Sequence, residues 1–176
     1  MRKSLAAGAP DAAERAAANL PLHRLGVFPV VAGYRPQGSE LDPWPAMRRM
    51  AEAGARLALP VAAGRDGPLS FRAYEPGDPL APDAFGIASP TTGAALVEPD
   101  LVITPLLAFD RCGRRMGQGA GHYDRTLAAL RARKVVFVLG LAYAGQEVAR
   151  MPVEAHDQPL DAILTEKAYI EAQKDL

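Results

Sequence analysis

Residues 101–141 read LVITPLLAFDRCGRRMGQGAGHYDRTLAALRARKVVFVLGL. Residues 101–104 form a short apolar run, which predicts a buried strand. Residues 122–133 carry apolar side chains along one stripe at helical spacing, which predicts a helix. Residues 135–141 are the most hydrophobic and β-branched run of the chain, so we expect them to form the centre of the sheet. A strand, a helix and a second strand in this order indicate a parallel sheet.

The same alternation recurs along the rest of the chain. Helical patterns cover residues 11–20, 45–53 and 166–172, and apolar strand-like runs cover residues 26–32, 56–62 and 161–164. The segment 64–98 is rich in proline and glycine and predicts a short hairpin followed by a long irregular crossover. The chain is therefore predicted to be α/β, with a single domain over residues 1–176. We expect an open, mostly parallel sheet with helices on both faces, a Rossmann-like three-layer architecture.

The composition argues against several classes of protein. The chain has 20 basic and 20 acidic residues, so its formal net charge is zero, whereas a general nucleic-acid binder needs a basic excess. Its longest apolar stretch, residues 135–144, is too short to cross a bilayer, which needs about 20 residues. The one cysteine, Cys112, cannot form an internal disulfide. We therefore expect a cytoplasmic protein with no nucleic-acid or membrane partner. We also expect a monomer, although composition does not decide the oligomeric state.

A glycine- and arginine-rich loop precedes the helix predicted at residues 122–133. Its glycines and arginines are Gly117, Gly119, Gly121, Arg111, Arg114 and Arg115. Alternating glycines let a loop turn sharply and direct several backbone N–H groups at one anion. The helix N-terminus adds partial positive charge, and arginines pair well with phosphate oxygens. The loop therefore favours a polyphosphate ligand. The alternative is a flexible surface turn with solvated arginines.

This loop differs from two common nucleotide-binding motifs. The chain has no GxxxxGK[ST] string, which a P-loop requires. His122 stands where a dinucleotide fingerprint needs its third glycine, so that interpretation is weak.

Two acidic residues near this loop are candidate metal ligands. Asp124 falls in the first turn of the predicted helix, and Asp157 lies in a loop before the strand predicted at 161–164. Carboxylates beside phosphates are the ligands that magnesium prefers, and open α/β sheets place their sites in such loops. The alternatives are that Asp124 complements the helix dipole and that Asp157 is an ordinary turn residue.

Residues 109–125, FDRCGRRMGQGAGHYDR, resemble the motif F-D-x-x-G-x-R-L-G-x-G-x-G-Y-Y-D-R of the 5-formyltetrahydrofolate cyclo-ligase family, also called methenyltetrahydrofolate synthetases. The resemblance extends over residues 26–166 and includes the loop GYRPQGSELDP, residues 33–43. It implies ATP-dependent conversion of 5-formyltetrahydrofolate to 5,10-methenyltetrahydrofolate, with release of ADP and phosphate. No side-chain nucleophile is implied, because phosphoryl transfer needs mainly positioning and charge neutralisation.

The resemblance also implies roles for particular residues. ATP would be bound by Arg115, Met116, Gly117, Gln118, Gly119, Ala120, Gly121, His122 and Tyr123. The folate would be bound by Glu40, Gln118, Gly119, Ala120, Gly121 and His122. Mg²⁺ would be held by Asp124 and Asp157.

Three features depart from the family pattern. His122 replaces the first tyrosine of Tyr-Tyr-Asp, and Ala120 and Met116 differ from the commonest residues by small or shape-preserving changes. The amino-terminal arm, which in the family carries Lys and Arg that reach ATP, is expected to be shortened here, and Arg2 and Lys3 are not expected to replace it. The shortened arm leaves open a non-catalytic relative that binds folate or nucleotide. A different enzyme of related architecture, such as a sugar-phosphate isomerase or a coenzyme A transferase, is a further alternative.

Overall fold

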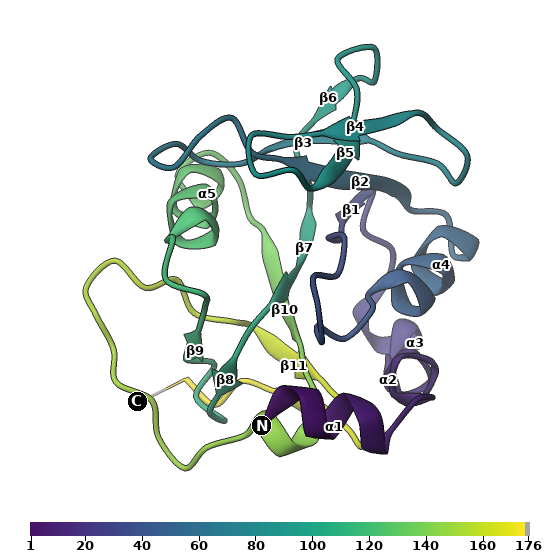
Figure 1. Cartoon of the computed structure of the whole chain (residues 1–176). Helices are drawn as coiled ribbons and strands as arrows, with labels where there is room; N and C mark the ends of the chain where they lie inside the picture. The colour runs from purple at the N-terminus through teal and green to yellow at the C-terminus, as the bar shows by residue number, and fades with distance from the viewer. Residues whose placement is uncertain (175–176) are drawn as a thin grey trace.

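The computed structural model describes residues 1–174, and its centre is an eight-stranded sheet in the order β12-β11-β10-β7-β1-β2-β3-β6 (Figure 1). The strands are β1 (Val30–Ala32), β2 (Arg56–Val61), β3 (Ser70–Ala73), β6 (Leu96–Val97), β7 (Leu101–Pro105), β10 (Phe137–Leu141), β11 (Ala162–Leu164) and β12 (Tyr169–Glu171). The middle strands, from β11 to β2, are parallel. Antiparallel strands extend the sheet at both edges, β12 beside β11 and β3 with β6 beside β2. The prediction of a mostly parallel α/β sheet is confirmed.

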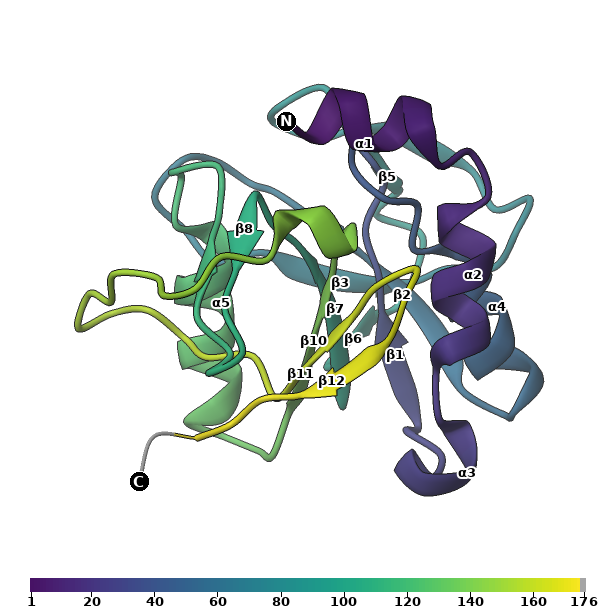
Figure 2. The same ribbon diagram turned by 90° about the horizontal axis from the view of Figure 1, so that it is seen from below.

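Helices cover both faces of this sheet (Figures 1 and 2). On one face lie α1 (Arg2–Gly8), α2 (Ala12–Asn19), α3 (Leu22–Leu25) and α4 (Trp44–Glu52). On the other face lies α5 (His122–Arg131). Each face buries its own hydrophobic cluster, so the three expected layers are present.

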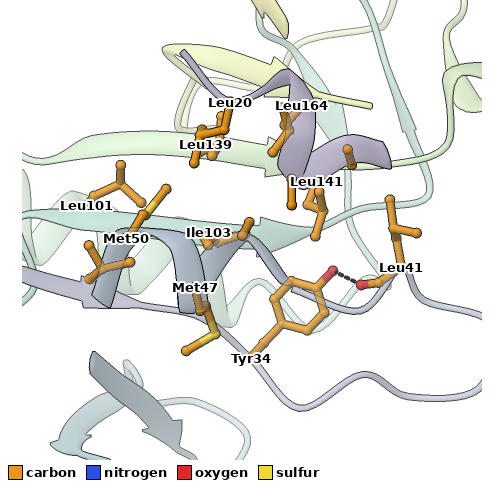
Figure 3. Packing of buried hydrophobic residues seen from close by; sticks show 14 of the residues in the cluster. Leu20, Tyr34, Leu41, Met47, Met50, Leu101, Ile103, Leu139, Leu141 and Leu164 are labelled. Carbon is orange, nitrogen blue, oxygen red and sulfur yellow. Dashed lines mark hydrogen bonds between the residues drawn. The ribbon is translucent and has the colours of Figure 1, made fainter. Parts of the chain in front are cut away.

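Alternation along the strands supplies both clusters, because successive side chains of a strand point to opposite faces. In β7, Leu101 and Ile103 belong to the cluster under α2 and α4, while Val102 belongs to the cluster under α5. Figure 3 shows the first cluster, where Met47 and Met50 of α4 approach Ile103 and Leu101. Continuous apolar runs therefore mark strands that are buried on both sides.

Two predictions of secondary structure are wrong. Residues 166–172 form no final helix but contain β12 (Tyr169–Glu171), and Ile170 of this strand pairs with Ile163 of β11. The side-chain oxygen of Thr165 accepts hydrogen bonds from the backbone of Lys167 and Ala168, which closes a tight turn and reverses the chain. Residues 135–141 are also not the centre of the sheet, since β7 and β1 occupy the middle and β10 lies beside them. A highly hydrophobic strand is one that is buried on both faces of the sheet, and β7, β1 and β10 all share this property. Hydrophobicity therefore does not tell which of these strands lies in the middle.

The long crossover between β2 and β7 contains more regular structure than predicted. Besides β3 and β6, it forms the hairpin β4 (Leu80–Pro82) and β5 (Ala88–Pro90). A second small hairpin, β8 (Ala108–Phe109) and β9 (Arg115–Met116), leads into the glycine loop, and a 3-10 turn, Ala144–Gln146, follows β10.

Candidate active site

The residues predicted to bind ligands lie in one pocket at the carboxyl ends of β1, β2 and β7. The pocket has a volume of about 640 Å³, and Tyr34, Ala62 and Leu106, which follow these strands, form part of its wall. Open α/β sheets bind ligands at this end of their strands. The predicted residues that line it are Glu40, Arg115, Met116, Gly117, Gln118, Gly119, Ala120, Gly121, His122, Tyr123, Asp124 and Asp157.

The glycine loop joins β9 to α5 and forms one side of the pocket (Figure 1). Gly119 has φ of 96° and Gly121 has φ of 70°, values that residues with a Cβ rarely adopt. A Cβ added at Gly117 or Gly119 would meet no described atom within 4 Å, so the loop backbone borders open space. Gly121 is the N-cap of α5, which places the positive end of that helix at the pocket. The loop is therefore shaped for an anion that contacts its backbone.

Arginines near the loop divide between the pocket and the surrounding fold. Arg115 lines the pocket with a 4% exposed side chain, and its Nη2 lies 2.9 Å from Oδ1 of Asp124. The Nε of Arg115 is buried without a hydrogen-bond partner among residues 1–174, so this donor is available to a ligand. Arg111 pairs with Glu147 at 2.7 Å, and Arg114 pairs with Asp110 at 3.4 Å. Neither Arg111 nor Arg114 is among the lining residues, so of these three arginines Arg115 is the one placed where a phosphate could be contacted.

The two candidate metal ligands come from segments that touch. Oδ1 of Asp124 accepts a hydrogen bond from the backbone N–H of Gln158 at 2.9 Å, and Gln158 directly follows Asp157. Oδ2 of Asp157 accepts from the backbone N–H of Glu154 at 2.8 Å. Glu154, His156 and Asp157 each offer a ligand atom, and these atoms lie within 4.8 Å of one another. This wall of the pocket is rich in carboxylate oxygens, the donors that suit Mg²⁺.

Glu40 faces the glycine loop from the segment that follows β1. Its side chain is 6% exposed, and its Oε1 accepts a hydrogen bond from Nε2 of Gln118 at 2.8 Å. Its Oε2 accepts from the backbone N–H of Gln37 at 2.8 Å. Burial raises the pKa of the Glu40 carboxyl, while the hydrogen bond from Gln37 and the charge of Arg2 oppose that rise. A half-desolvated carboxylate at this position can accept hydrogen bonds from the donor edge of a pterin-like ring.

Two aromatic residues keep their protons in this pocket. Burial, together with the negative charge of Glu40, raises the pKa of the Tyr123 phenol. The pKa of the Tyr34 phenol rises for the same reasons, and its hydroxyl donates to the carbonyl of Leu41 (Figure 3). Both phenols therefore remain neutral at physiological pH, and neither supplies a base.

The structure draws attention to Arg2, which was not expected to act in the site, and to Phe85 and Asp110, for which no role was predicted from the sequence. The guanidinium of Arg2, in α1, lies 4.0 Å from Oε1 of Glu40, and its Nε donates to the hydroxyl of Ser39 at 3.0 Å. Phe85, in the β4–β5 hairpin, lines the pocket with its ring 5.2 Å from the ring of His122 in an edge-on arrangement. Asp110 is buried beneath the β8–β9 hairpin. Asp110 belongs to the motif at residues 109–125, so the sequence could have indicated its importance. Arg2 and Phe85 lie far from this motif in the sequence and reach the site through tertiary contacts.

His122, where the family motif has tyrosine, joins the pocket to a neighbouring loop. Its Nε2 lies 2.8 Å from the carbonyl oxygen of Gly64, and Nη2 of Arg125 donates to the carbonyl of Arg65 at 2.7 Å. Oγ1 of Thr126 accepts from the backbone N–H of Leu69 at 2.8 Å. Three residues at the start of α5 therefore hold the segment between β2 and β3 beside the pocket.

Fold and pocket together define an open α/β protein whose pocket lies where a glycine loop meets a helix N-terminus, a place suited to an anionic ligand. Comparison with known proteins gives the particular family. The model of the 5-formyltetrahydrofolate cyclo-ligase family matches residues 8–166, and the chain belongs to this family. The resemblance carried by residues 109–125 is thereby confirmed, and the alternative of an isomerase or transferase of related architecture is set aside.

Individual relatives agree with this assignment. The chain is 36% identical over 150 residues to the 5-formyltetrahydrofolate cyclo-ligase of Mycolicibacterium smegmatis, and the aligned region covers 81% of this chain and 76% of the relative. It is 40% identical over 134 residues to that of Escherichia coli K12, covering 72% and 71%. The NMR structure of Aquifex aeolicus 5,10-methenyltetrahydrofolate synthetase superposes with a TM-score of 0.72 at 30% identity, covering 93% of this chain and 82% of that one. The synthetase of Mycoplasma pneumoniae shares the fold, with a TM-score of 0.68 at 19% identity over 94% and 96% of the two chains.

Proposed function

We propose that the pocket described above is the active site of an ATP-dependent 5-formyltetrahydrofolate cyclo-ligase. The enzyme converts 5-formyltetrahydrofolate to 5,10-methenyltetrahydrofolate and consumes ATP. One observation carries the assignment of roles: a glycine loop at a helix N-terminus and the Glu40 carboxylate face each other and are joined by Gln118. An anion site therefore lies directly beside a site that accepts hydrogen bonds, as a reaction between ATP and a folate requires.

The chemistry asks for positioning more than for a reactive side chain. The γ-phosphoryl group of ATP passes to the formyl oxygen, which turns a poor leaving group into a good one. The nitrogen at position ten then attacks the formyl carbon, phosphate leaves with that oxygen, and the nitrogen loses its proton as the ring closes. Backbone N–H groups of residues 117–121 would bind the ATP phosphates, and Arg115 would neutralise developing charge through its unpaired Nε. Glu40 would orient the pterin ring and so hold the formyl oxygen against ATP.

Magnesium fits the same pocket. Asp124 and Asp157 supply hard oxygen donors from touching segments, and the hydrogen bonds that Asp124 accepts from described residues all go to Oδ1. Its Oδ2 is then free of those bonds and suits a cation. Mg²⁺, when bound there, would neutralise phosphate charge and hold the phosphoryl group in line. Asp124 would also hold Arg115 in place, because Oδ1 of Asp124 accepts a hydrogen bond from Nη2 of Arg115 at 2.9 Å.

Other properties of the enzyme follow as parts of the same proposal. A catalytic protein is preferred to a non-catalytic relative, since the relatives that the chain matches over most of its length are named 5-formyltetrahydrofolate cyclo-ligases. One sheet joins strands from β1 to β12, which supports a single domain. Within residues 1–174, no helix is long and apolar enough to cross a bilayer. The lone cysteine supports a cytoplasmic location, and the balanced charge argues against a nucleic-acid partner.

One assay tests the function directly. Purified protein is mixed with 5-formyltetrahydrofolate, and the absorbance of methenyltetrahydrofolate is followed with ATP and Mg²⁺, with each alone, and with neither. We expect product when both are present. Binding of ATP and folate without product would favour a non-catalytic relative.

A further inference from the structure

The loop of residues 147–160, called the 147–160 loop below, carries Asp157 and is held at both ends by the β8–β9 hairpin. At its start, the backbone N–H of Val148 donates to the carbonyl of Phe109 at 2.8 Å, and Glu147 pairs with Arg111 at 2.7 Å. At its end, the backbone N–H of Leu160 donates to the carbonyl of Gly113 at 2.8 Å. The hairpin thus sets the position of the segment between these contacts.

The buried carboxylate of Asp110 makes the central contact of this arrangement. Its Oδ2 accepts from the backbone N–H of Met151, in the 147–160 loop, at 2.8 Å. Its Oδ1 accepts from the backbone N–H groups of Cys112 and Arg114, at 2.9 and 3.2 Å, which shapes the hairpin turn. The guanidinium of Arg114 also donates to Oδ2 at 3.4 Å. Asp110 is 1% exposed, and a buried charge with this many donors is stable because its lone pairs are used.

Gly113 lets the two segments approach each other this closely. Its φ is 83°, and a Cβ at this position would lie 2.5 Å from the carbonyl oxygen of Leu160 and 2.9 Å from Cβ of Ala172. A side chain would therefore push the end of the 147–160 loop away from the hairpin. Neither Asp110 nor Gly113 is among the residues that line the pocket, whereas Met151, Glu154, His156 and Asp157 all are.

We infer that Asp110 is a positioning residue, which places Asp157 against Asp124 by holding the 147–160 loop to the β8–β9 hairpin. The same hairpin carries Arg115, the partner of Asp124, in β9, so one small element sets the position of both sides of the site. This inference rests on the proposed magnesium site at Asp124 and Asp157. It requires that loss of the Asp110 carboxylate loosen the loop and weaken the magnesium dependence together.

The test replaces Asp110 by asparagine, which keeps the shape but turns one acceptor oxygen into a donor. The matched control is Asp100→Asn, because the Asp100 carboxylate also accepts from a backbone N–H, that of Val30 at 2.9 Å, and from a cation, Lys134 at 2.6 Å. Asp100 stands at the amino ends of the strands and does not line the pocket. Two readouts are taken on folded protein: the rate of tryptic cleavage after the exposed Arg150, and the Mg²⁺ concentration that gives half-maximal activity.

In Asp110→Asn we expect cleavage after Arg150 to rise about fivefold or more, because the loop opens locally. The half-saturating Mg²⁺ concentration should rise about tenfold, as for other losses of groups that support metal ligands. The KM for 5-formyltetrahydrofolate should change by less than about twofold, since Glu40 belongs to a different loop. A purely structural role would lower thermal stability in both Asp110→Asn and Asp100→Asn without this selective loss of magnesium affinity.

The inference is overturned if either the cleavage rate or the half-saturating Mg²⁺ concentration stays within about twofold of wild type, roughly 0.4 kcal/mol. Asp157→Asn, measured alongside, separates two causes of failure. If Asp157→Asn also leaves the half-saturating Mg²⁺ concentration unchanged, the assignment of Asp157 as a metal ligand is wrong. If Asp157→Asn raises that concentration, the positioning role of Asp110 is wrong. Should Asp110→Asn fail to fold, Arg111→Gln removes an exposed contact of the same loop, and the same two readouts must then rise by about twofold or the inference is lost.

Discussion

Nε2 of Gln118 lies 2.8 Å from Oε1 of Glu40 and joins two loops that are 78 residues apart in the sequence. Gln118 belongs to the glycine loop expected to hold ATP, and Glu40 follows the first strand of the sheet. In the proposed site, this hydrogen bond marks the place where the folate and ATP would meet.

Glu40→Gln should impair folate binding more than ATP binding. Hydrogen bonds to a charged group contribute about 1.5–3 kcal/mol, so the KM for 5-formyltetrahydrofolate should rise at least about tenfold. The KM for ATP should change by less than about threefold, because within residues 1–174 one hydrogen bond, from Gln118, joins Glu40 to the glycine loop. Steady-state kinetics with each substrate varied in turn provides the measurement. Glu14→Gln, which removes an exposed acid paired with Arg48, is the control, and equal effects at the two positions would refute a folate role for Glu40.

The pH dependence of the reaction should report the raised pKa of Glu40. The ionised carboxylate is the form that accepts hydrogen bonds from the pterin, so kcat/KM for the folate should fall as pH falls through that pKa. Because the charge of Arg2 lowers this pKa, Arg2→Gln should move the acid limb to higher pH. Lys3→Gln, a neighbouring loss of the same charge, is the control and should leave the limb in place. If the acid limb of the kcat/KM profile persists in Glu40→Gln, a group other than Glu40 is responsible for it.

Gly119→Val should weaken ATP binding while the fold survives. A β-branched residue at φ of 96° costs about 1–2 kcal/mol of strain, and its side chain would occupy the space where phosphate must approach. Gly77→Val is a matched control, because Gly77 has the same φ of 96° and equally open surroundings but lies outside the pocket. Calorimetry should show ATP affinity reduced at least about tenfold in Gly119→Val and unchanged in Gly77→Val. An affinity of Gly119→Val within about threefold of wild type would contradict the assigned phosphate cradle.

Asp124→Asn and Asp157→Asn should each weaken the magnesium dependence, and the double variant should be little worse than the poorer single one. Two groups that act through one ion lose their effect together. Asp124→Asn should also raise the KM for ATP, because Asp124 holds Arg115 at 2.9 Å. Asp161→Asn is the control, since Asp161 pairs with Arg131 at 3.1 Å and does not line the pocket. A magnesium-bound structure with the two carboxylates more than about 8 Å apart would exclude a shared ion, whose ligand bonds are about 2 Å.

Most strands and helices of the fold could be predicted from the sequence, and the wrong predictions concern single segments. The strands at 101–105 and 137–141 and the helix that begins at His122 follow from apolar periodicity, which is a property of neighbouring residues. The helix predicted at residues 166–172 is wrong because a segment of seven residues suits either a helix or a strand. The local turn at Thr165 reverses the chain, and pairing with β11, a contact between segments, makes residues 169–171 a strand.

The sequence by itself determined the glycine loop, the helix N-terminus behind it and the place of Asp124 in the first helical turn, because these depend on backbone geometry within a few residues. Tertiary structure alone decided that Arg115 enters the pocket while Arg111 and Arg114 pair with Glu147 and Asp110. It also brought Arg2 to Glu40 and Gln158 to Asp124. The physical reason is that a charged side chain takes the best partner within reach, and for a residue in a loop that partner is set by the packing of distant segments.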